Sequence, residues 1–301
     1  MVVLDSLDDR FCSLRFQRRA LAMLKPVRKV HLSGEPIPVL GQGTWHMAEH
    51  SQRRHEEIAA LRLGNDLGMT LIDTAEMYAD GATEELVGDA IDGRRDEVFL
   101  VSKVLPEHAS RRGTIEACER SLRRLRTDRL DLYLLHWRGR IPLEEAVDAF
   151  RILMRDEKIR HWGVSNLDVE DMRELLAIGG DAVATDQVLY NITRRGIEYD
   201  LLPWCRERRI PIMAYSPIEQ GRLLEHPTVG VIAEKRGATP AQVALAWVLR
   251  HPDVAAIPKA GSREHVRENR AALEIPLEPD DLARLDEAFP PPTTKKPLEV
   301  L

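Results

Sequence analysis

Short apolar runs that alternate with helical segments are the feature of this sequence that most constrains its fold. The predicted strands cover residues 39–45, 69–73, 98–103, 130–136, 159–165, 184–188, 210–215 and 254–258. The predicted helices that follow them cover about residues 53–67, 83–91, 114–125, 143–157, 169–178, 201–209, 240–250 and 263–272. Strands separated by helices pair in parallel through right-handed crossovers. The pattern therefore predicts an α/β protein with one parallel sheet.

Eight strand-helix units are the number that a closed (β/α)8 barrel, or TIM barrel, requires. The alternative is an open doubly wound sheet, whose first strand is normally followed by G-x-G-x-x-G and, about 20 residues on, by an acidic residue. The segment 41–45 lacks the third glycine, and Asp73 ends the next strand about 30 residues further on. The barrel is therefore the favoured architecture.

The N-terminal part of the chain precedes the first strand-helix unit. Residues 29–40 form two short apolar stretches around an S-G-E-P turn, which predicts a β-hairpin that caps the barrel bottom. No linker-like or low-complexity segment interrupts the rest, so residues 28–301 are predicted to be a single domain. Residues 1–27 are interpreted as an extension that is disordered or loosely docked, or as a misassigned start, with Met23 as the alternative start.

Composition excludes several kinds of partner. The net charge is -6 and basic residues are interspersed with acidic ones, so no basic stripe offers a footprint for nucleic acid. No apolar run is long enough to span a membrane, and the acidic residues within the first 27 positions argue against a signal peptide, so we expect a cytoplasmic protein. Cys12, Cys118 and Cys205 form no metal-binding pattern. The mixed-charge surface pattern predicts a monomer.

Three predicted strands end on an ionisable residue. Asp73 ends the second strand, Lys103 the third and His136 the fourth. The C-terminal ends of barrel strands meet at one rim, where the loops build the active site, so these side chains are expected to converge. A buried charge without a partner is costly, which predicts that Lys103 and Asp73 pair.

Tyr78 follows Asp73 by five residues, which lets the loop fold the phenol back over the same rim. A neighbouring Lys103 ammonium favours phenolate, so we expect it to lower the tyrosine pKa from its usual value of about 10. Tyr78 then becomes a usable acid, while His136 orients a carbonyl oxygen and stabilises the charge that develops on it. These side chains suit the reduction of a carbonyl group.

Five motifs in fixed order carry a resemblance to a known family. They are D73-T-A-E-M-Y78, V101-S-K103, L135-H-W137, G163-V-S-N166 and I257-P-K259. From about residue 30 to its end, the chain resembles the aldo-keto reductases, and segments 42–47 and 75–80 look most like bacterial members described as methylglyoxal reductases. Asp73, Tyr78, Lys103 and His136 match the positions of the family's four catalytic residues. The resemblance also implies a nicotinamide dinucleotide lying extended across the barrel top.

The resemblance assigns cofactor contacts by position. Ser165, Asn166 and Gln187 match the residues that hold the carboxamide, and Tyr215 matches the aromatic residue that stacks on the nicotinamide ring. The complete cofactor set is Gly43, Thr44, Trp45, Asp73, Ser165, Asn166, Gln187, Tyr215, Ser216, Pro217, Ile218, Gln220, Lys259, Ser262, Arg263, His265, Glu268 and Asn269.

The adenine end of the cofactor site departs from the family pattern at one position. Lys259 is expected to face the 2'-phosphate, which implies NADPH in preference to NADH. Many relatives carry an arginine where this chain has His265, although Arg263 and Arg267 lie close by in the sequence. Glu268 and Asn269 match the pair on the adenine side.

The predicted function is NADPH-dependent reduction of small aldehydes and 2-oxoaldehydes, with Tyr78 as the general acid. Trp45, Tyr78, His136 and Trp137 are expected to line the substrate pocket. The tail after Pro290 is short, which predicts an open pocket. Two alternatives stay open: a Schiff-base aldolase or isomerase with Lys103 as nucleophile, and a cofactor-binding sensor or interaction subunit of the same fold.

Overall fold

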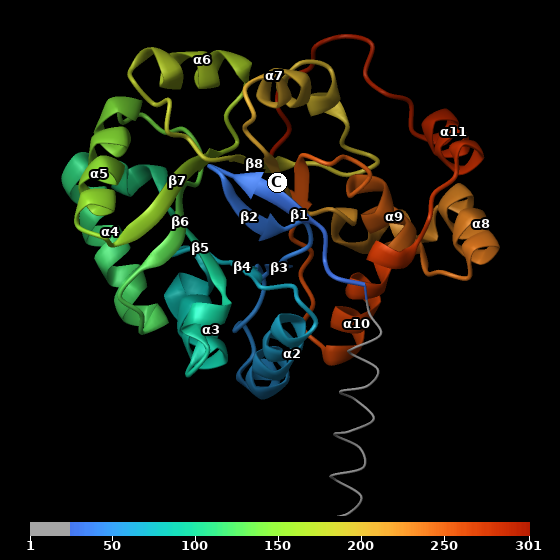
Figure 1. Cartoon of the computed structure of the whole chain (residues 1–301), viewed down its shortest axis with the longest axis horizontal. Helices are drawn as coiled ribbons and strands as arrows, with labels where there is room; N and C mark the ends of the chain where they lie inside the picture. Colours follow the sequence, from blue (N-terminus) through green and yellow to red (C-terminus); the bar gives the residue numbers. More distant parts are fainter. Residues whose placement is uncertain (1–24) are drawn as a thin grey trace, which may run out of the picture.

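Eight parallel strands follow one another in sequence order in the computed structural model, which describes residues 25–301 (Figure 1). They are β3 (Gln42–Gly43), β4 (Leu71–Asp73), β5 (Phe99–Val104), β6 (Leu130–Leu135), β7 (Ile159–Ser165), β8 (Asp186–Leu189), β9 (Ile212–Tyr215) and β10 (Val254–Ala256). Parallel bridges from Leu40 to Ala256 and from Gly43 to Lys259 join the first strand region to the last. The predicted (β/α)8 fold is confirmed. Most of the predicted extension lies outside the described residues.

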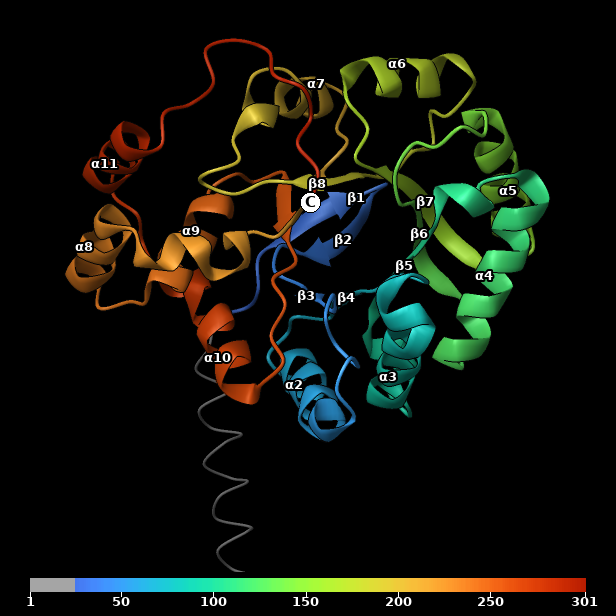
Figure 2. The ribbon, with the colours of Figure 1, turned by 180° about the vertical axis from the view of Figure 1, so that it is seen from behind.

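The helices lie around the strands (Figures 1 and 2). The predicted ones are α2 (Arg54–Asp66), α3 (Ala82–Ile91), α4 (Arg111–Leu125), α5 (Leu143–Arg155), α6 (Val169–Ala177), α7 (Leu201–Glu207), α9 (Pro240–Val248) and α10 (Arg263–Ala271). Two further helices, α8 (Pro227–Arg236) and α11 (Pro279–Ala288), were not predicted. Both begin on a proline, and Gly237 ends α8 with a φ of 59°, so start and stop signals were present in the sequence.

The N-terminal hairpin closes the bottom of the barrel. Strands β1 (Lys29–Leu32) and β2 (Glu35–Pro38) pair antiparallel. The Glu35 carboxylate lies 2.8 Å from the Arg160 guanidinium and 2.9 Å from His161 Nε2, both at the N-terminal end of β7. Strand N-termini mark the bottom of such a barrel. The hairpin therefore lies at the end opposite the expected active site.

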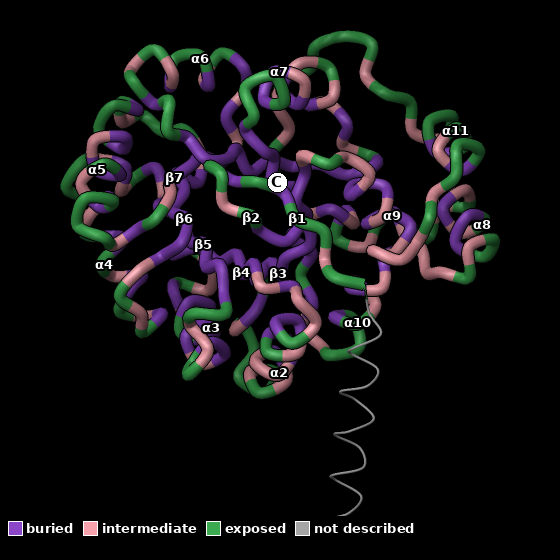
Figure 3. Tube along the Cα trace, in the orientation of Figure 1, coloured by how far each residue is buried: buried purple, intermediate pink, exposed green. Residues whose placement is uncertain are grey.

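The barrel wall is buried along most of its length (Figure 3). All residues of β5 and β6 are buried, because the barrel interior covers one face and the helices cover the other. Closure between β3 and β10 requires a glycine at residue 43, since a Cβ there would lie 2.5 Å from the Ile257 carbonyl oxygen. Among residues 25–301, no helix is long and apolar enough to cross a membrane, and no metal-binding cluster is found.

Asp186 in β8 is an unusual buried acid. It has no exposed surface, and neither carboxyl oxygen has a well-formed hydrogen bond among residues 25–301, although the Leu167 backbone N–H is close enough to offset part of the effect of burial on its pKa. Burial raises the pKa of Asp186 well above its usual range, and the nearby Asp171 and Asp168 carboxylates add to the rise. The folded state therefore holds a proton that the unfolded chain releases above its pKa of about 3.9. Stability is lost as the pH rises from that value toward the raised pKa of the folded state, by at most about 1.4 kcal/mol per pH unit.

Asp186→Asn should therefore stabilise the protein by about 2 kcal/mol or more at neutral pH, because a neutral amide replaces the buried acid. The gain should shrink toward about pH 4, where the unfolded aspartate is also protonated. Urea unfolding of both proteins across this pH range measures the difference. An equal gain at every pH would show that Asp186 carries no raised pKa.

Candidate active site

The three strand-end residues meet Tyr78 at one rim of the barrel. Lys103 Nζ donates hydrogen bonds to Asp73 Oδ2 at 2.7 Å, to the Thr74 carbonyl oxygen at 2.9 Å and to the Tyr78 hydroxyl at 3.2 Å. Lys103 is completely buried, and Asp73 is nearly so. These contacts compensate the lysine charge, as expected for an ammonium group without access to water. The strand register explains why Lys103 meets Asp73. Asp73 pairs with Val101 on β5, and because side chains alternate between the two faces of a strand, the next residue of β5 on the same face as Val101 is Lys103.

The loop after β4 turns sharply to present Tyr78. Ala79, Asp80 and Gly81 follow it with φ values of 46°, 51° and 90°, a left-handed run that costs free energy at the two non-glycine positions. Glu76 anchors the loop to the segment that follows β5. Its Oε1 accepts hydrogen bonds from the Leu105 backbone N–H and from His108 Nδ1, both at 2.9 Å.

Burial decides the protonation state of Tyr78. It raises the pKa of the phenol above its ordinary value, and the Lys103 ammonium offsets only part of the rise. The expectation that the tyrosine pKa is lowered was therefore wrong in its net direction. The attraction of Lys103 is present, but desolvation of a phenolate at this depth costs more. Tyr78 is consequently protonated at neutral pH, which is the form that can donate a proton.

His136 follows β6 and lines the same rim. Its ring lies edge-on to the Tyr78 ring, with 5.9 Å between the centroids. Burial, with a smaller effect of the Lys103 charge, lowers the pKa of His136 to about 2. The imidazole is therefore neutral at physiological pH and can donate one hydrogen bond to a substrate oxygen.

Carbonyl reduction should show no pH inflection near about 6.5, the usual histidine pKa, because His136 titrates far below it. The rate should fall only above the ordinary tyrosine value of about 10, where Tyr78 begins to lose its proton. Oxidation of the product alcohol needs the phenolate and should accelerate with pH over the same range. Profiles of kcat/KM in both directions test this. A reduction profile that bends near neutral pH would contradict the assignment.

A cavity of about 400 Å³ opens above these residues. Its lining contains most of the predicted set: Gly43, Thr44, Trp45, Asp73, Tyr78, His136, Trp137, Ser165, Asn166, Gln187, Tyr215, Ser216, Pro217, Ile218, Gln220 and Lys259. The volume falls in the range of small-molecule and cofactor sites.

Hydrogen bonds join the predicted carboxamide residues into a chain. The Tyr215 hydroxyl donates to Asn166 Oδ1 at 2.9 Å, and Asn166 Nδ2 donates to Ser165 Oγ and to the His136 carbonyl oxygen, both at 3.1 Å. Gln187 Nε2 donates a hydrogen bond to Asp73 Oδ1 at 2.8 Å. Gln187 is therefore bonded to the ion pair formed by Lys103 and Asp73. The polar groups at this end of the cavity are thus fixed in position by one another.

Five predicted cofactor residues do not line the cavity: Ser262, Arg263, His265, Glu268 and Asn269. They lie at the start of α10 or within it. Arg263 is paired with Glu56 at 3.2 Å, and Glu268 accepts a hydrogen bond from Thr239 Oγ1 at 2.6 Å. Asn269 Nδ2 is buried and has no hydrogen-bond partner among residues 25–301. Their role at the adenine end remains a prediction.

Sequence reasoning missed part of the cavity wall. The additional lining residues are His46, Met77, Gly221, Ile257, Pro258, Val300 and Leu301. The last two belong to the short tail, which was expected to leave the pocket open. The Leu301 backbone N–H donates to the Tyr215 hydroxyl at 3.4 Å, so the short tail reaches the site. The apolar ending of the chain was a weak signal for this, but no pattern predicted where it docks.

The family assignment agrees with this geometry. The model of the Aldo/keto reductase family matches residues 39–289, and the chain belongs to this family. It is 53% identical over 281 residues to methylglyoxal reductase YeaE of Escherichia coli (strain K12), covering 91% of this chain and 99% of that protein. It is 34% identical to glyoxal reductase of Bacillus subtilis (strain 168), covering 87% and 92%.

Solved structures lead to the same family. An aldo-keto reductase from Klebsiella pneumoniae in complex with NADPH superposes with a TM-score of 0.90 and is 54% identical, over 92% of this chain and 100% of that one. A Klebsiella pneumoniae aldo/keto reductase in complex with NADP and acetate gives a TM-score of 0.89 at 54% identity, over 91% and 100%. Residues 290–301, which include the two tail residues at the cavity, lie beyond the family match.

Proposed function

We propose that this protein is an NADPH-dependent reductase of small aldehydes and 2-oxoaldehydes such as methylglyoxal. The observation that carries the proposal is the contact between the protonated Tyr78 hydroxyl and the buried Lys103–Asp73 pair, at the floor of the cavity of about 400 Å³. The similarity to methylglyoxal and glyoxal reductases supports the substrate class.

The residues present fit a nicotinamide dinucleotide. Tyr215 offers an aromatic ring at the cavity, and Ser165 and Asn166 offer polar groups beside it. Lys259 is exposed and forms no ion pair with the described residues, so its ammonium is free for a phosphate. Asn269 adds a buried donor without a partner. When bound, the cofactor supplies the hydride for the carbonyl carbon.

The chain's own groups orient the carbonyl and supply the proton. Tyr78 donates its hydroxyl proton to the carbonyl oxygen as negative charge develops there. The neutral His136 donates a hydrogen bond to the same oxygen, and Lys103 stabilises the phenolate that Tyr78 becomes. Trp45 and Trp137 provide apolar walls beside the reacting carbonyl.

The aldolase alternative conflicts with the position of Lys103. A Schiff-base lysine must reach the substrate as a neutral amine. Lys103 has no exposed surface, and its ammonium already donates to Asp73, Thr74 and Tyr78. The Asp73 carboxylate and Tyr78 help to raise its pKa despite burial. We therefore reject Lys103 as a nucleophile.

Turnover separates the reductase from the sensor alternative. NADPH oxidation would be followed by absorbance, with methylglyoxal and with 4-nitrobenzaldehyde as substrates. Turnover of either aldehyde supports the reductase. Tight NADPH binding without turnover of any aldehyde would contradict it and favour a cofactor-binding sensor.

Lys259→Met should lower kcat/KM for NADPH by about tenfold or more and leave that for NADH nearly unchanged, because the lysine is proposed to pair with the 2'-phosphate. Wild-type protein should prefer NADPH. Steady-state kinetics with both cofactors measure the two ratios. Equal kcat/KM for NADPH and NADH in the wild type would refute the preference, and so would an equal loss for both in the variant.

The remaining proposals concern the protein's setting. We place it in the cytoplasm as a monomer whose partner is a small carbonyl compound, without nucleic acid. The two described cysteines, Cys118 and Cys205, support a reducing compartment, because both are free and buried. Burial raises the pKa of both thiols, which keeps them unreactive.

A further inference from the structure

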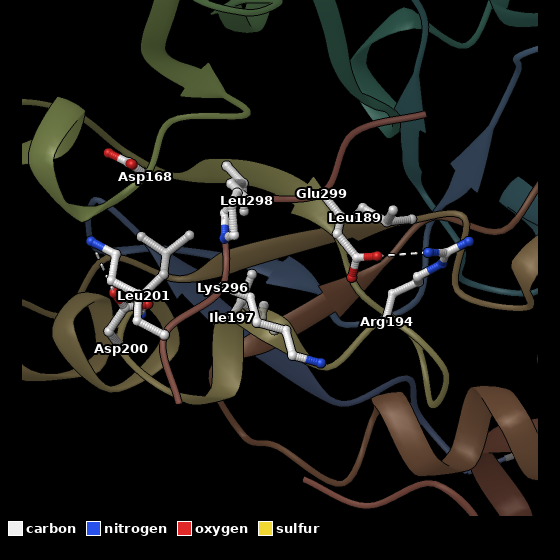
Figure 4. A pocket seen from close by; sticks show the side chains of 12 residues that line it. Asp168, Leu189, Arg194, Ile197, Asp200, Leu201, Lys296, Leu298 and Glu299 are labelled. Atoms are coloured by element: carbon white, nitrogen blue, oxygen red, sulfur yellow. Dashed lines mark hydrogen bonds and ion pairs between the residues drawn. The ribbon is translucent and has the colours of Figure 1, made fainter. Parts of the chain in front are cut away.

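The last residues of the chain form a strap that ends at the active-site cavity. Figure 4 shows the part of this strap that precedes the cavity, with the ion pair between Glu299 and Arg194 as a dashed line. We define the C-terminal strap as residues 295–301. Lys295 Nζ holds its beginning through Glu170 at 2.5 Å, and Glu299 holds its end through Arg194 Nη1 at 2.6 Å. Val300 and Leu301 follow directly and line the cavity. The Arg194–Glu299 pair is therefore the last anchor before the cavity wall.

Arg194 has a second partner, Glu219, which lies in the segment after β9. Arg194 Nε and Nη2 both donate to Glu219 Oε1, each at 3.2 Å. Glu219 is only 4% exposed, and its other oxygen accepts a hydrogen bond from Asn191 Nδ2 at 2.7 Å. The same Asn191 amide donates to the Ser216 carbonyl oxygen at 3.0 Å. Arg194 thus lies between the strap and the loop that follows β9.

The loop after β9 is strained and forms another wall of the cavity. Ser216, Glu219 and Gln220 have φ values of 50°, 50° and 55°, in the left-handed region. Such backbone persists only when its surroundings hold it in place. Ser216, Gln220 and Gly221 also line the cavity. The bonds from Asn191 and Arg194 are therefore well placed to maintain this wall.

We propose that Arg194 is a positioning residue that joins two walls of the active site, the strap through Glu299 and the loop after β9 through Glu219. Its link to Glu299 seats Val300 and Leu301 and so sets the size of the substrate side. Its link to Glu219 stabilises the loop on the proposed cofactor side. The kinetic consequences rest on the proposed reductase function, whereas the structural link does not.

Seating of the strap can be measured without turnover, by the rate at which a carboxypeptidase releases Leu301 and Val300. Arg194→Gln and Glu299→Gln should each speed release about two- to fivefold, the range expected for a partly exposed ion pair. The double variant should release Leu301 and Val300 no faster than the faster of the two single variants, because both substitutions break the same contact between Arg194 and Glu299. High salt should speed release from wild type more than from the variants, in which only the pair between Lys295 and Glu170 is left for salt to weaken.

Arg222→Gln is the matched control. Arg222 also reaches Glu219 Oε1, at 3.2 Å, but it has no ion pair with the strap among the described residues. Release from this variant should equal that of wild type. Faster release from Arg222→Gln would mean that any lost charge near Glu219 loosens the strap. Wild-type release rates in both Arg194→Gln and Glu299→Gln would likewise overturn the proposal.

Measurements of KM and of the rate of NADPH release then separate the effect of the strap from the effect of the loop after β9. Glu299→Gln should raise KM for methylglyoxal severalfold with little change in kcat or in NADPH release. Arg194→Gln should raise the same KM and also speed NADPH release in stopped-flow fluorescence, since it loosens the loop as well. Equal effects of the two variants on NADPH release would overturn the link to the loop. If wild type reduces no carbonyl, the release measurements still test the strap, and only the proposed function fails.

Discussion

Tyr78→Phe should lower kcat for methylglyoxal reduction by about 10²–10⁴-fold, the usual contribution of a positioned general acid. The phenyl ring keeps its place beside His136 but has no proton to donate, and Lys103 loses one of its three hydrogen-bond acceptors. NADPH binding should be nearly unchanged, because the hydroxyl is proposed to act on the substrate. Steady-state kinetics and a fluorescence titration with NADPH measure the two properties.

The control for this experiment is Tyr199→Phe, since Tyr199 is a half-exposed tyrosine outside the cavity lining. That variant should match wild type in both measurements. Retained turnover in Tyr78→Phe would refute Tyr78 as the acid. A parallel loss of NADPH binding would show instead that the hydroxyl organises the cofactor site.

Lys103→Met should destabilise the protein by about 3–5 kcal/mol, the usual cost of breaking a buried ion pair by removing one partner. Asp73 would stay buried, with Gln187 as a remaining side-chain donor. Reductase activity should also fall, because the phenolate form of Tyr78 loses its stabilising cation. Urea unfolding compared with wild type gives the change in stability.

The double variant Lys103→Met with Asp73→Asn separates the charge from the packing. Removing the orphaned carboxylate should recover much of the lost stability, since a neutral pair of similar volume avoids the cost of burying one charge. A double variant as unstable as Lys103→Met would show that the loss comes from poor packing of methionine. Neither variant should recover activity, because both lack the ammonium beside Tyr78.

The strand ends could be predicted because their geometry is local. A side chain at the C-terminal end of a barrel strand points to the rim whatever the rest of the chain does, so Asp73, Lys103 and His136 could be placed from their positions alone. The eight strand-helix units could be predicted for the same reason, since hydrophobic periodicity depends only on residues that are close together in the sequence. The helices α8 and α11 were missed despite their proline start signals, because neither is needed to complete an eight-unit barrel.

The net pKa of Tyr78 depended on the tertiary structure. A lysine nearby in the fold implied a lowered pKa, but the depth of burial around the phenol reversed the sign. The burial of a side chain depends on residues from many segments that are distant in the sequence, so no local sequence pattern predicts it. The same reason applies to Asp186, whose position in an apolar strand gave no indication that both its oxygens would lack well-formed hydrogen bonds to the described residues.

The sequence alone determined the barrel and the four residues at its rim, because both follow from short-range periodicity and from the direction of side chains at strand ends. Only the tertiary structure decided how the cavity is closed. Leu301 donates to the Tyr215 hydroxyl, Val300 and Leu301 line the cavity, and the ion pair just before them joins Glu299 to Arg194, 105 positions away in the chain. Contacts at such separations depend on the whole fold, so the strap, and with it the outer wall of the active site, could not be read from the order of the residues.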